Sequence, residues 1–422
     1  MTRAPDAPDD ARVNADDVLA GLDRLRPREI AVAVPTYNNA ATVKAVAEAI
    51  GSAAEGLLAG VPIVVLNVDA GSSDGTSDLL AAGTVSSVRF THAAPLNERL
   101  SVPFHGVPGR GGALATAFRA AQRIGVRALL VVEADVPSLT AEWIASLARP
   151  VLEEKADFVS PAYVRHRFEG TITNLLIAPL IRALYGRRLR QPLGGHRAFS
   201  GRLVEHLIAQ PRWAAFARES TDLWIVGTAI ADGFTVAETW LGRRVVRSTA
   251  RSTDLPTMIA QTLGATFEVM HAHEDLWLEV RGSEPVTEIG PVVPPSMESG
   301  PVDVARMLDG FRRGLRDLLP IWEHILAPET LGEVLALDTG GDRLQFPDDL
   351  WARVVYDFAL GYHYDVVHRD HLLRSLVPLY LGRTAAFVLA AEPRSAEASE
   401  ALMDRVATGF ERQKPYLTER WR

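Results

Sequence analysis

Short apolar runs separated by polar turns and helical segments mark the first two thirds of the chain. Five apolar residues in a row at 128–132 predict a buried strand. The same pattern predicts strands at 29–34, 62–68, 128–132 and 157–161. Between them, segments such as Ala41–Leu58 carry Ala, Val and Ile at helical spacing, with Asn39 or Thr42 as the candidate N-cap. This alternation predicts an α/β fold with a mostly parallel sheet and helices on both faces.

The last third of the chain changes to helical periodicity. Helical spacing recurs at 254–282, 302–334, 345–380 and 395–422. Residues 285–301 include five prolines and two glycines, which predict a linker. Residues 1–27, rich in Asp, Ala and Pro, predict a flexible tail. We therefore expect a tail at 1–27, an α/β domain at 28–252 and a mainly helical region at 253–422.

Polar residues gather where the predicted strands end. Pro35-Thr-Tyr-Asn-Asn39 follows the first strand, and Asp69-Ala-Gly-Ser-Ser-Asp-Gly-Thr76 follows the second. Glu133 and Asp135 follow the 128–132 run and, two residues apart on extended backbone, point the same way. Ligands of open α/β sheets gather at the carboxyl ends of strands. The acidic pair suits Mg²⁺ or Mn²⁺ held together with substrate phosphates, although a solvated turn with two ordinary acids has the same pattern.

A glycine-rich segment, Val107–Phe118, opens the helix before the 128–132 strand. Backbone N–H groups at a helix start favour anions, and Arg110 adds a guanidinium there. The chain has no Walker phosphate loop, and its first strand ends in Pro-Thr-Tyr-Asn rather than in a G-x-G-x-x-G turn. These absences disfavour a P-loop enzyme and a dinucleotide-dependent dehydrogenase.

Composition narrows the function classes further. The formal charge of −8 in 422 residues disfavours nucleic acid and anionic membranes as main partners. Cysteine is absent, which excludes disulfides, thiolate metal sites and a cysteine nucleophile. No apolar run approaches the roughly 18–20 residues of a membrane span, and the start of the chain lacks the features of a signal peptide. We expect a cytoplasmic protein without a membrane span.

Three polar segments follow the fourth predicted strand, at 163–174, 191–200 and 218–224. Their arginines, hydroxyls and Asp222, next to a metal and nucleotide site, suit a small, polar, anionic acceptor. The alternative is that the arginines at 165, 167, 187, 188 and 190 cover a helix surface.

Jointly, these motifs resemble the GT-A-fold glycosyltransferases, which use nucleotide-diphosphate sugars. The resemblance rests on Pro35-Thr-Tyr-Asn, Asp69-Ala-Gly-Ser-Ser-Asp-Gly-Thr, Gly109-Arg-Gly-Gly-Ala-Leu and Glu133-Ala-Asp. More narrowly, Phe168-Glu-Gly-Thr-Ile-Thr-Asn, Gln191-Pro-Leu-Gly-Gly and Thr221-Asp-Leu-Trp are similar to the retaining glucosylglycerate and mannosylglycerate synthases. Glucosyl-3-phosphoglycerate synthases are more distant relatives. The resemblance covers residues 28–265 well and 345–390 moderately, and it implies a GT-A catalytic domain, Rossmann-like, plus a C-terminal α-helical subdomain.

The resemblance also implies roles for individual residues. The nucleotide sugar would contact Pro35, Thr36, Tyr37, Asn39, Asp69, Arg110, Glu133, Leu193 and Gly194. The acceptor would contact Gly170, Thr171, Thr173, Asn174 and Asp222. Asp135 would hold the divalent metal directly, with Glu133 beside it. The catalytic residues would be Asp135, Asp222 and Arg110.

Two positions depart from the family pattern. The relatives place a metal-binding histidine where this chain has Val246, and an acidic residue where it has His196. His196 is therefore a candidate metal ligand or acceptor contact, as well as a candidate for a packed histidine without a ligand. His271 and His273 would point to different faces of a helix. The histidines at 363, 368 and 371 are predicted on a helix surface.

The function implied is retaining transfer of a hexose, glucose or mannose, from a nucleotide diphosphate to a small hydroxy acid such as D-glycerate. Relatives that use a phosphorylated acceptor have an arginine where this chain has Thr171, whose hydroxyl cannot clamp a phosphate. The helical region would support a homodimer. The alternatives are another small-molecule acceptor, a sugar-phosphate nucleotidyltransferase, and a non-catalytic protein that binds nucleotide sugars.

Overall fold

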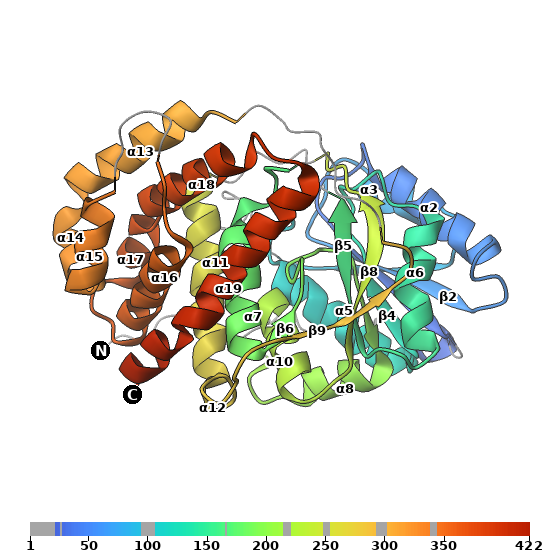
Figure 1. Ribbon diagram of the computed structural model, residues 1–422. Helices are drawn as coiled ribbons and strands as arrows, with labels where there is room; N and C mark the ends of the chain where they lie inside the picture. Colours follow the sequence, from blue (N-terminus) through green and yellow to red (C-terminus); the bar gives the residue numbers. More distant parts are fainter. Residues whose placement is uncertain are drawn as a thin grey trace, which may run out of the picture.

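The fold is seen in a computed structural model that describes residues 22–25, 28–93, 106–164, 167–213, 221–247, 254–292, 302–337 and 344–422. Figure 1 shows two halves side by side, a sheet flanked by helices and a mass of orange and red helices. The predicted α/β domain followed by a helical region is confirmed.

Eight strands of the described chain form one sheet, in the order β10-β8-β5-β7-β4-β1-β2-β3. Their bounds are β1 Ile30–Thr36, β2 Ile63–Asp69, β3 Ser87–Thr91, β4 Ala128–Val131, β5 Phe158–Val164, β7 Arg197–Ser200, β8 Val236–Arg243 and β10 Thr287–Ile289. β7 runs antiparallel to β4 and β5, and the other pairings are parallel. β6 (Arg187–Arg188) and β9 (Glu284–Pro285) form a separate pair. The mostly parallel sheet predicted from the apolar runs is confirmed.

Helices cover both faces of the sheet because side chains alternate along each strand. Ile30, Val32 and Val34 of β1 belong to the apolar cluster under α2 (Val43–Glu55) and α6 (Ala141–Leu152). Ala31 and Ala33 face the opposite cluster. Helices of the described chain that contribute to that second cluster are α5 Arg110–Ile124, the π-helical turn η2 Thr173–Ile177, α7 Ala178–Tyr185, α8 Gly201–Ala209 and α10 Thr221–Ala231. A short helix, α3 (Thr76–Ala81), follows β2.

The C-terminal helices pack on this second face. They are α11 Leu255–Ala272, α12 Glu274–Trp277, α13 Val304–Asp317, α14 Leu319–Ile325, α15 Pro328–Leu335, α16 Asp348–His363, α17 Arg369–Ser375, α18 Val377–Ala391 and α19 Ala396–Arg420. One apolar cluster runs without a break from Phe118 of α5 to Phe410 of α19. Trp351 of α16 donates a hydrogen bond to the Leu175 carbonyl at 2.7 Å. The two halves therefore share one core.

Two segments differ from the boundaries predicted at the sequence level. Leu22–Leu25, inside the predicted tail, form a 3-10 helix (η1) whose Leu22 is buried in the core beside α5. The predicted linker begins with β9 and β10, and β10 extends the sheet beside β8. Prolines mark a break in helical structure, but the residues between Pro285 and Pro291 keep backbone groups that can pair with an edge strand. The remainder of the predicted linker, 293–301, lies outside the described residues.

One helical stretch of the described chain, Arg369–Ala391, is long and apolar enough by composition to cross a membrane. In the fold, 78% of its apolar window is buried inside the protein. A buried core helix passes the same test, so the stretch is weak evidence for a span.

Candidate active site

The carboxyl ends of β1 and β2 are joined by a network of hydrogen bonds centred on Asp69. One carboxylate oxygen accepts from the hydroxyls of Thr36 at 2.8 Å and Ser72 at 2.6 Å. The other accepts from the backbone N–H groups of Gly71 at 3.2 Å and Ser72 at 2.9 Å. Asn67 donates to the Thr36 hydroxyl at 2.8 Å. Asp69 is only 1% exposed, so these donors fix its carboxylate without a buried cation.

The Pro-Thr-Tyr-Asn turn lies directly against this network. The Asn39 side chain accepts from the Tyr37 N–H at 2.8 Å, and the Asn39 N–H donates to the Thr76 hydroxyl at 2.7 Å. Tyr37 packs against the small apolar cluster of Ala70 and Val107. A half-buried aromatic ring beside an anchored carboxylate can take the base and ribose of a nucleotide, as predicted for these residues.

Glu133 lies at the neighbouring strand end and is held by an arginine. Its carboxylate is 5% exposed and accepts from the Arg244 guanidinium at 2.6 Å. A Cβ at position 195 would lie 1.9 Å from the Glu133 carboxyl carbon, so only glycine leaves room for this side chain. His196 Nδ1 lies 3.7 Å from the same carboxylate. The structure therefore brings Glu133 and His196 together, with Arg244 as an additional member.

His196 is fully buried and bonded to Tyr163. The Tyr163 oxygen accepts from the His196 backbone N–H at 3.2 Å and lies 2.6 Å from Nδ1. Either atom of the Tyr163–Nδ1 contact donates, according to the histidine tautomer. Burial lowers the pKa of His196 to about 4, so the ring is neutral near pH 7. Nε2 is buried without a hydrogen-bond partner in the described chain, so a ligand role for His196 would fall to this atom and stays a prediction.

The segment after β8 runs beside the Asp135 turn. The Arg247 N–H donates to the Asp135 carbonyl at 2.8 Å, and the Val245 N–H donates to the Ser138 hydroxyl at 2.9 Å. Val246, at the position where relatives have a metal-binding histidine, is 39% exposed in this segment. The valine side chain has no ligand atom. The same segment instead supplies Arg244.

Asp222 joins two further arginines. Arg110, at the start of α5, donates to one of its oxygens at 3.2 Å, and Arg197 donates to the other at 2.8 Å. Arg197 also donates to the carbonyls of Gly194 at 2.6 Å and Pro192 at 3.2 Å. The predicted residues Arg110, Asp222 and Gly194 are therefore assembled around Arg197. Sequence reasoning missed Arg197, although a charged residue opening the apolar strand β7 is an unusual signal.

Asp135 and Glu133 would offer a divalent cation two carboxylates that differ in exposure. Asp135 is partly exposed, and Glu133 is 5% exposed and paired with Arg244. Among the described residues no group of three or more His, Asp, Glu or Cys side chains could hold a metal. Mg²⁺ and Mn²⁺ accept sites of one or two carboxylates completed by substrate phosphates. The residues therefore fit a cation that arrives with a diphosphate.

Four of the five predicted acceptor residues lie in the turn before η2 or in its first two residues, and Asp222 lies at the start of α10. Gly170 has a positive φ of 73°, and the Asn174 N–H donates back to its carbonyl at 2.9 Å. The Thr171 hydroxyl lies 2.5 Å from the Tyr380 hydroxyl of α18, whereas Thr173 is buried. Tyr380 was not predicted, because 209 residues separate it from Thr171.

Three further histidines named from the sequence, His271, His273 and His363, belong to the helical half. His271 and His363 pack against Trp421, with ring centroids 5.4 and 4.0 Å from the indole. His273 is bonded to the Tyr185 hydroxyl at 2.9 Å. These contacts explain the histidines by packing.

No protein-family profile matches the chain, and no curated protein matches it. It is similar to solved structures of glucosyl-3-phosphoglycerate synthase from Mycobacterium tuberculosis. The structure with Mn²⁺, UDP-glucose and phosphoglyceric acid is 23% identical, with a TM-score of 0.44, over 70% of this chain and 96% of that one. The structure with Mg²⁺ and UDP is 24% identical, with a TM-score of 0.44, over 64% and 85%. The likeness to glucosyl-3-phosphoglycerate synthases indicated by the motifs is thus found again.

Proposed function

We propose that the protein is a retaining glycosyltransferase. It moves a hexose, glucose or mannose, from a nucleotide diphosphate to a small hydroxy acid such as D-glycerate, with a divalent cation. The carrying observation is that a hydrogen-bond network around Asp69 and a set of paired arginines around Asp222 and Glu133 lie at neighbouring strand ends. In a nucleotide sugar, the nucleoside would meet the Asp69 network and the charged diphosphate that follows it would meet the arginines.

The diphosphate would meet the start of α5 and the side chains near it. α5 has 15 residues and begins at Arg110, after Gly109 in the left-handed conformation with φ 64°. The Arg110 Nη2 atom is buried without a hydrogen-bond partner in the described chain. An unsatisfied guanidinium N–H beside a helix start can donate to a phosphate oxygen. Arg110 is thus a residue that would bind the leaving group.

The sugar transfer would proceed through an oxocarbenium-like state. The acceptor hydroxyl would attack from the face that the diphosphate leaves, and a phosphate oxygen would take the proton. A bound divalent cation would neutralise charge on the leaving diphosphate, and Asp135 would hold it. Asp222, paired with Arg110 and Arg197, would lie beside the Leu193–Gly194 loop and stabilise positive charge on the sugar.

The acceptor side offers hydroxyls rather than a free cation. The Thr171 hydroxyl shares a hydrogen bond with the Tyr380 hydroxyl, and no guanidinium stands at position 171. An unphosphorylated acceptor such as D-glycerate suits this turn better than 3-phosphoglycerate. A different small-molecule acceptor is the second candidate, supported by the two departures at Val246 and His196.

The test is a product assay with UDP- and GDP-linked glucose and mannose. Each donor is offered D-glycerate or 3-phosphoglycerate, with Mg²⁺, with Mn²⁺ and with chelator. We expect cation-stimulated transfer from one donor to D-glycerate. Release of pyrophosphate from a nucleoside triphosphate and a sugar phosphate would instead identify a nucleotidyltransferase. Donor binding without transfer or hydrolysis would identify a non-catalytic binding protein.

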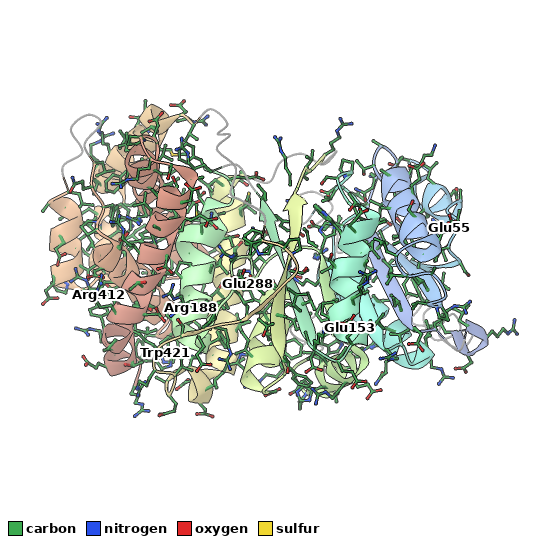
Figure 2. All side chains as sticks on the ribbon, turned by 45° about the vertical axis from the view of Figure 1, so that its right-hand side comes forward. Glu55, Glu153, Arg188, Glu288, Arg412 and Trp421 are labelled. Carbon is green, nitrogen blue, oxygen red and sulfur yellow. The ribbon has the colours of Figure 1, made fainter. Side chains whose placement is uncertain are left out.

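Asp135→Ala should lower kcat by at least about a thousandfold, equivalent to roughly 4 kcal/mol of transition-state stabilisation, because the cation loses its accessible carboxylate. Circular dichroism should be unchanged, since Asp135 is partly exposed. Glu153→Ala, at an exposed carboxylate beyond the end of α6, is the matched control (Figure 2). Retained turnover with normal cation dependence in Asp135→Ala would contradict the assignment.

A further inference from the structure

A cavity of about 570 Å³ lies outside the strand-end site, between the sheet edge, α7 and α19. One wall is a single face of the helix that ends in α7, with Asn174, Ala178 and Arg182 at spacings of four. Residues 396–407 of α19 form the opposite wall, and Glu238 of β8 lies between them. Figure 1 shows α19 crossing in front of α7 toward β5. The volume is that of a small-molecule site.

This cavity is distinct from the edge that would hold the nucleotide sugar. Of the residues predicted from the sequence to bind donor, acceptor or metal, only Asn174 lines it. Figure 2 shows two lining residues, Arg188 and Glu288, at the front of the molecule between the helical half and the sheet. A ligand in this cavity would lie either on the acceptor side of the strand-end site or in a separate site.

The arginines of the cavity are already paired. Arg182 donates to Asp404 at 2.5 Å and contacts Glu411 at 2.7 Å. Arg190 lies 3.6 Å from Glu288 and stacks on Trp240 at 5.0 Å from the ring centroid. The other two lining arginines donate to backbone carbonyls of 391, 392 and 394 (Arg167) and to Ser283 (Arg188).

The lining carboxylates outnumber these arginines, six to four. They are Glu169, Glu238, Glu288, Glu397, Glu400 and Asp404. An anion would therefore meet paired guanidinium groups and an excess of negative charge. Phosphorylated and carboxylate ligands are disfavoured in this cavity.

The buried part of the cavity presents uncharged hydrogen-bonding groups. Gln191 is 8% exposed, and its Nε2 donates to the Tyr163 carbonyl at 3.0 Å, which directs Oε1 away from that carbonyl. Oε1 is buried without a hydrogen-bond partner in the described chain. Glu238 is 1% exposed and accepts from the Arg190 N–H at 2.6 Å. Burial raises the pKa of Glu238 to about 8, so near pH 7 it is largely a neutral acid that both donates and accepts.

We propose that this cavity binds an uncharged, hydroxyl-rich ligand of the size of a sugar or polyol, recognised by Gln191 and Glu238. Hydroxyl groups satisfy the orphaned Gln191 oxygen, which otherwise costs free energy by being buried unpaired. An ammonium group would need an ionised partner at the same depth, where Glu238 holds a proton. The ligand is either a free sugar or the distal part of an acceptor that enters past Asn174.

The test measures binding of methyl α-D-glucoside and maltose by isothermal titration calorimetry, without donor nucleotide. Glucose 6-phosphate and glucosamine are the charged probes. We expect saturable binding of a neutral probe, weakened at least about tenfold by Gln191→Leu. Because no donor is present, the result is independent of the proposed transfer reaction.

If Gln191→Leu disturbs folding, a second variant that fills the cavity provides the test instead. Ala401 is an exposed lining residue of α19, so Ala401→Phe should abolish probe binding with little effect on the fold. Ala398→Phe, on the same helix and outside the lining, is the matched control. Loss of probe binding on addition of the acceptor found in the transfer assay would assign the cavity to the distal part of that acceptor, and unchanged binding would assign it to a free sugar.

The proposal is overturned by any of three results. The first is that neither neutral probe binds the intact protein. The second is that Ala401→Phe binds a neutral probe as tightly as the Ala398→Phe control does. The third is that glucose 6-phosphate or glucosamine binds more tightly than the neutral probes.

Discussion

Two polar regions of this molecule balance buried carboxylates in opposite ways. At the strand-end site, Glu133 is paired with Arg244, and Asp222 with Arg110 and Arg197. In the cavity beside α19, Glu238 meets backbone N–H groups, and burial raises its pKa to about 8. The first region pairs its carboxylates with guanidinium groups, and these ion pairs can rearrange around a charged ligand. In the second region the carboxyl group of Glu238 is protonated, which suits an uncharged ligand.

The largest expected effect comes from breaking the ion-paired region at its centre. Asp222→Ala would leave Arg197, 2% exposed, and Arg110, 7% exposed, close together without their shared anion. We expect the free energy of unfolding to fall by about 3 to 5 kcal/mol, measured by urea denaturation. Asp275→Ala removes an exposed carboxylate and is the control. Equal losses of stability in Asp222→Ala and Asp275→Ala would show that the fold does not need Asp222 to pair with Arg110 and Arg197.

The second effect separates the two regions by pH. The pKa of Glu238 is raised in the folded state from 4.5 to about 8, so the unfolded chain releases this proton first as pH rises. Stability should therefore be greatest below about pH 4.5 in this respect and fall between pH 5 and pH 8 by on the order of 3 kcal/mol. Glu238→Gln should remove the loss and be the more stable protein at pH 8 in urea denaturation. A difference between the two proteins that is the same at pH 5 and pH 8 would contradict the protonated cavity.

The smallest effect concerns the hydrogen-bond network around the Asp69 carboxylate at β1 and β2. Asp69→Asn would turn an amide N–H₂ group toward donors that now bind a carboxylate, including the Ser72 N–H. We expect a loss of about 2 kcal/mol in stability and at least about tenfold weaker nucleotide binding, measured by denaturation and calorimetry. Asp78→Asn, at a side chain 87% exposed, is the control. Unchanged nucleotide affinity would remove Asp69 from the donor pocket.

The sequence predicted the features of the fold that are local. Strands, their polar turns and the helix opening at Arg110 follow from apolar runs and glycines within a few residues. The Glu133–Arg244 pair joins residues 111 apart, and its formation depends on which strands become neighbours. The resemblance singled out Val246 in the sequence, but not Arg244 two residues before it. The cavity was not predicted, since no motif marks Gln191 Oε1 as unpartnered.

The contact between α7 and α19 also sets an order of events during synthesis. Arg182 and Asp404, which close one end of the cavity, are 222 residues apart. At 5–20 residues per second, the ribosome would deliver the second partner roughly 10 to 45 s after the first. Until then the apolar face of α7 that α19 covers stays open to other chains. The hydrogen-bond network at β1 and β2 can form early in translation, whereas the cavity becomes complete only near its end. In that interval the exposed apolar face of α7 is a surface that chaperones can bind.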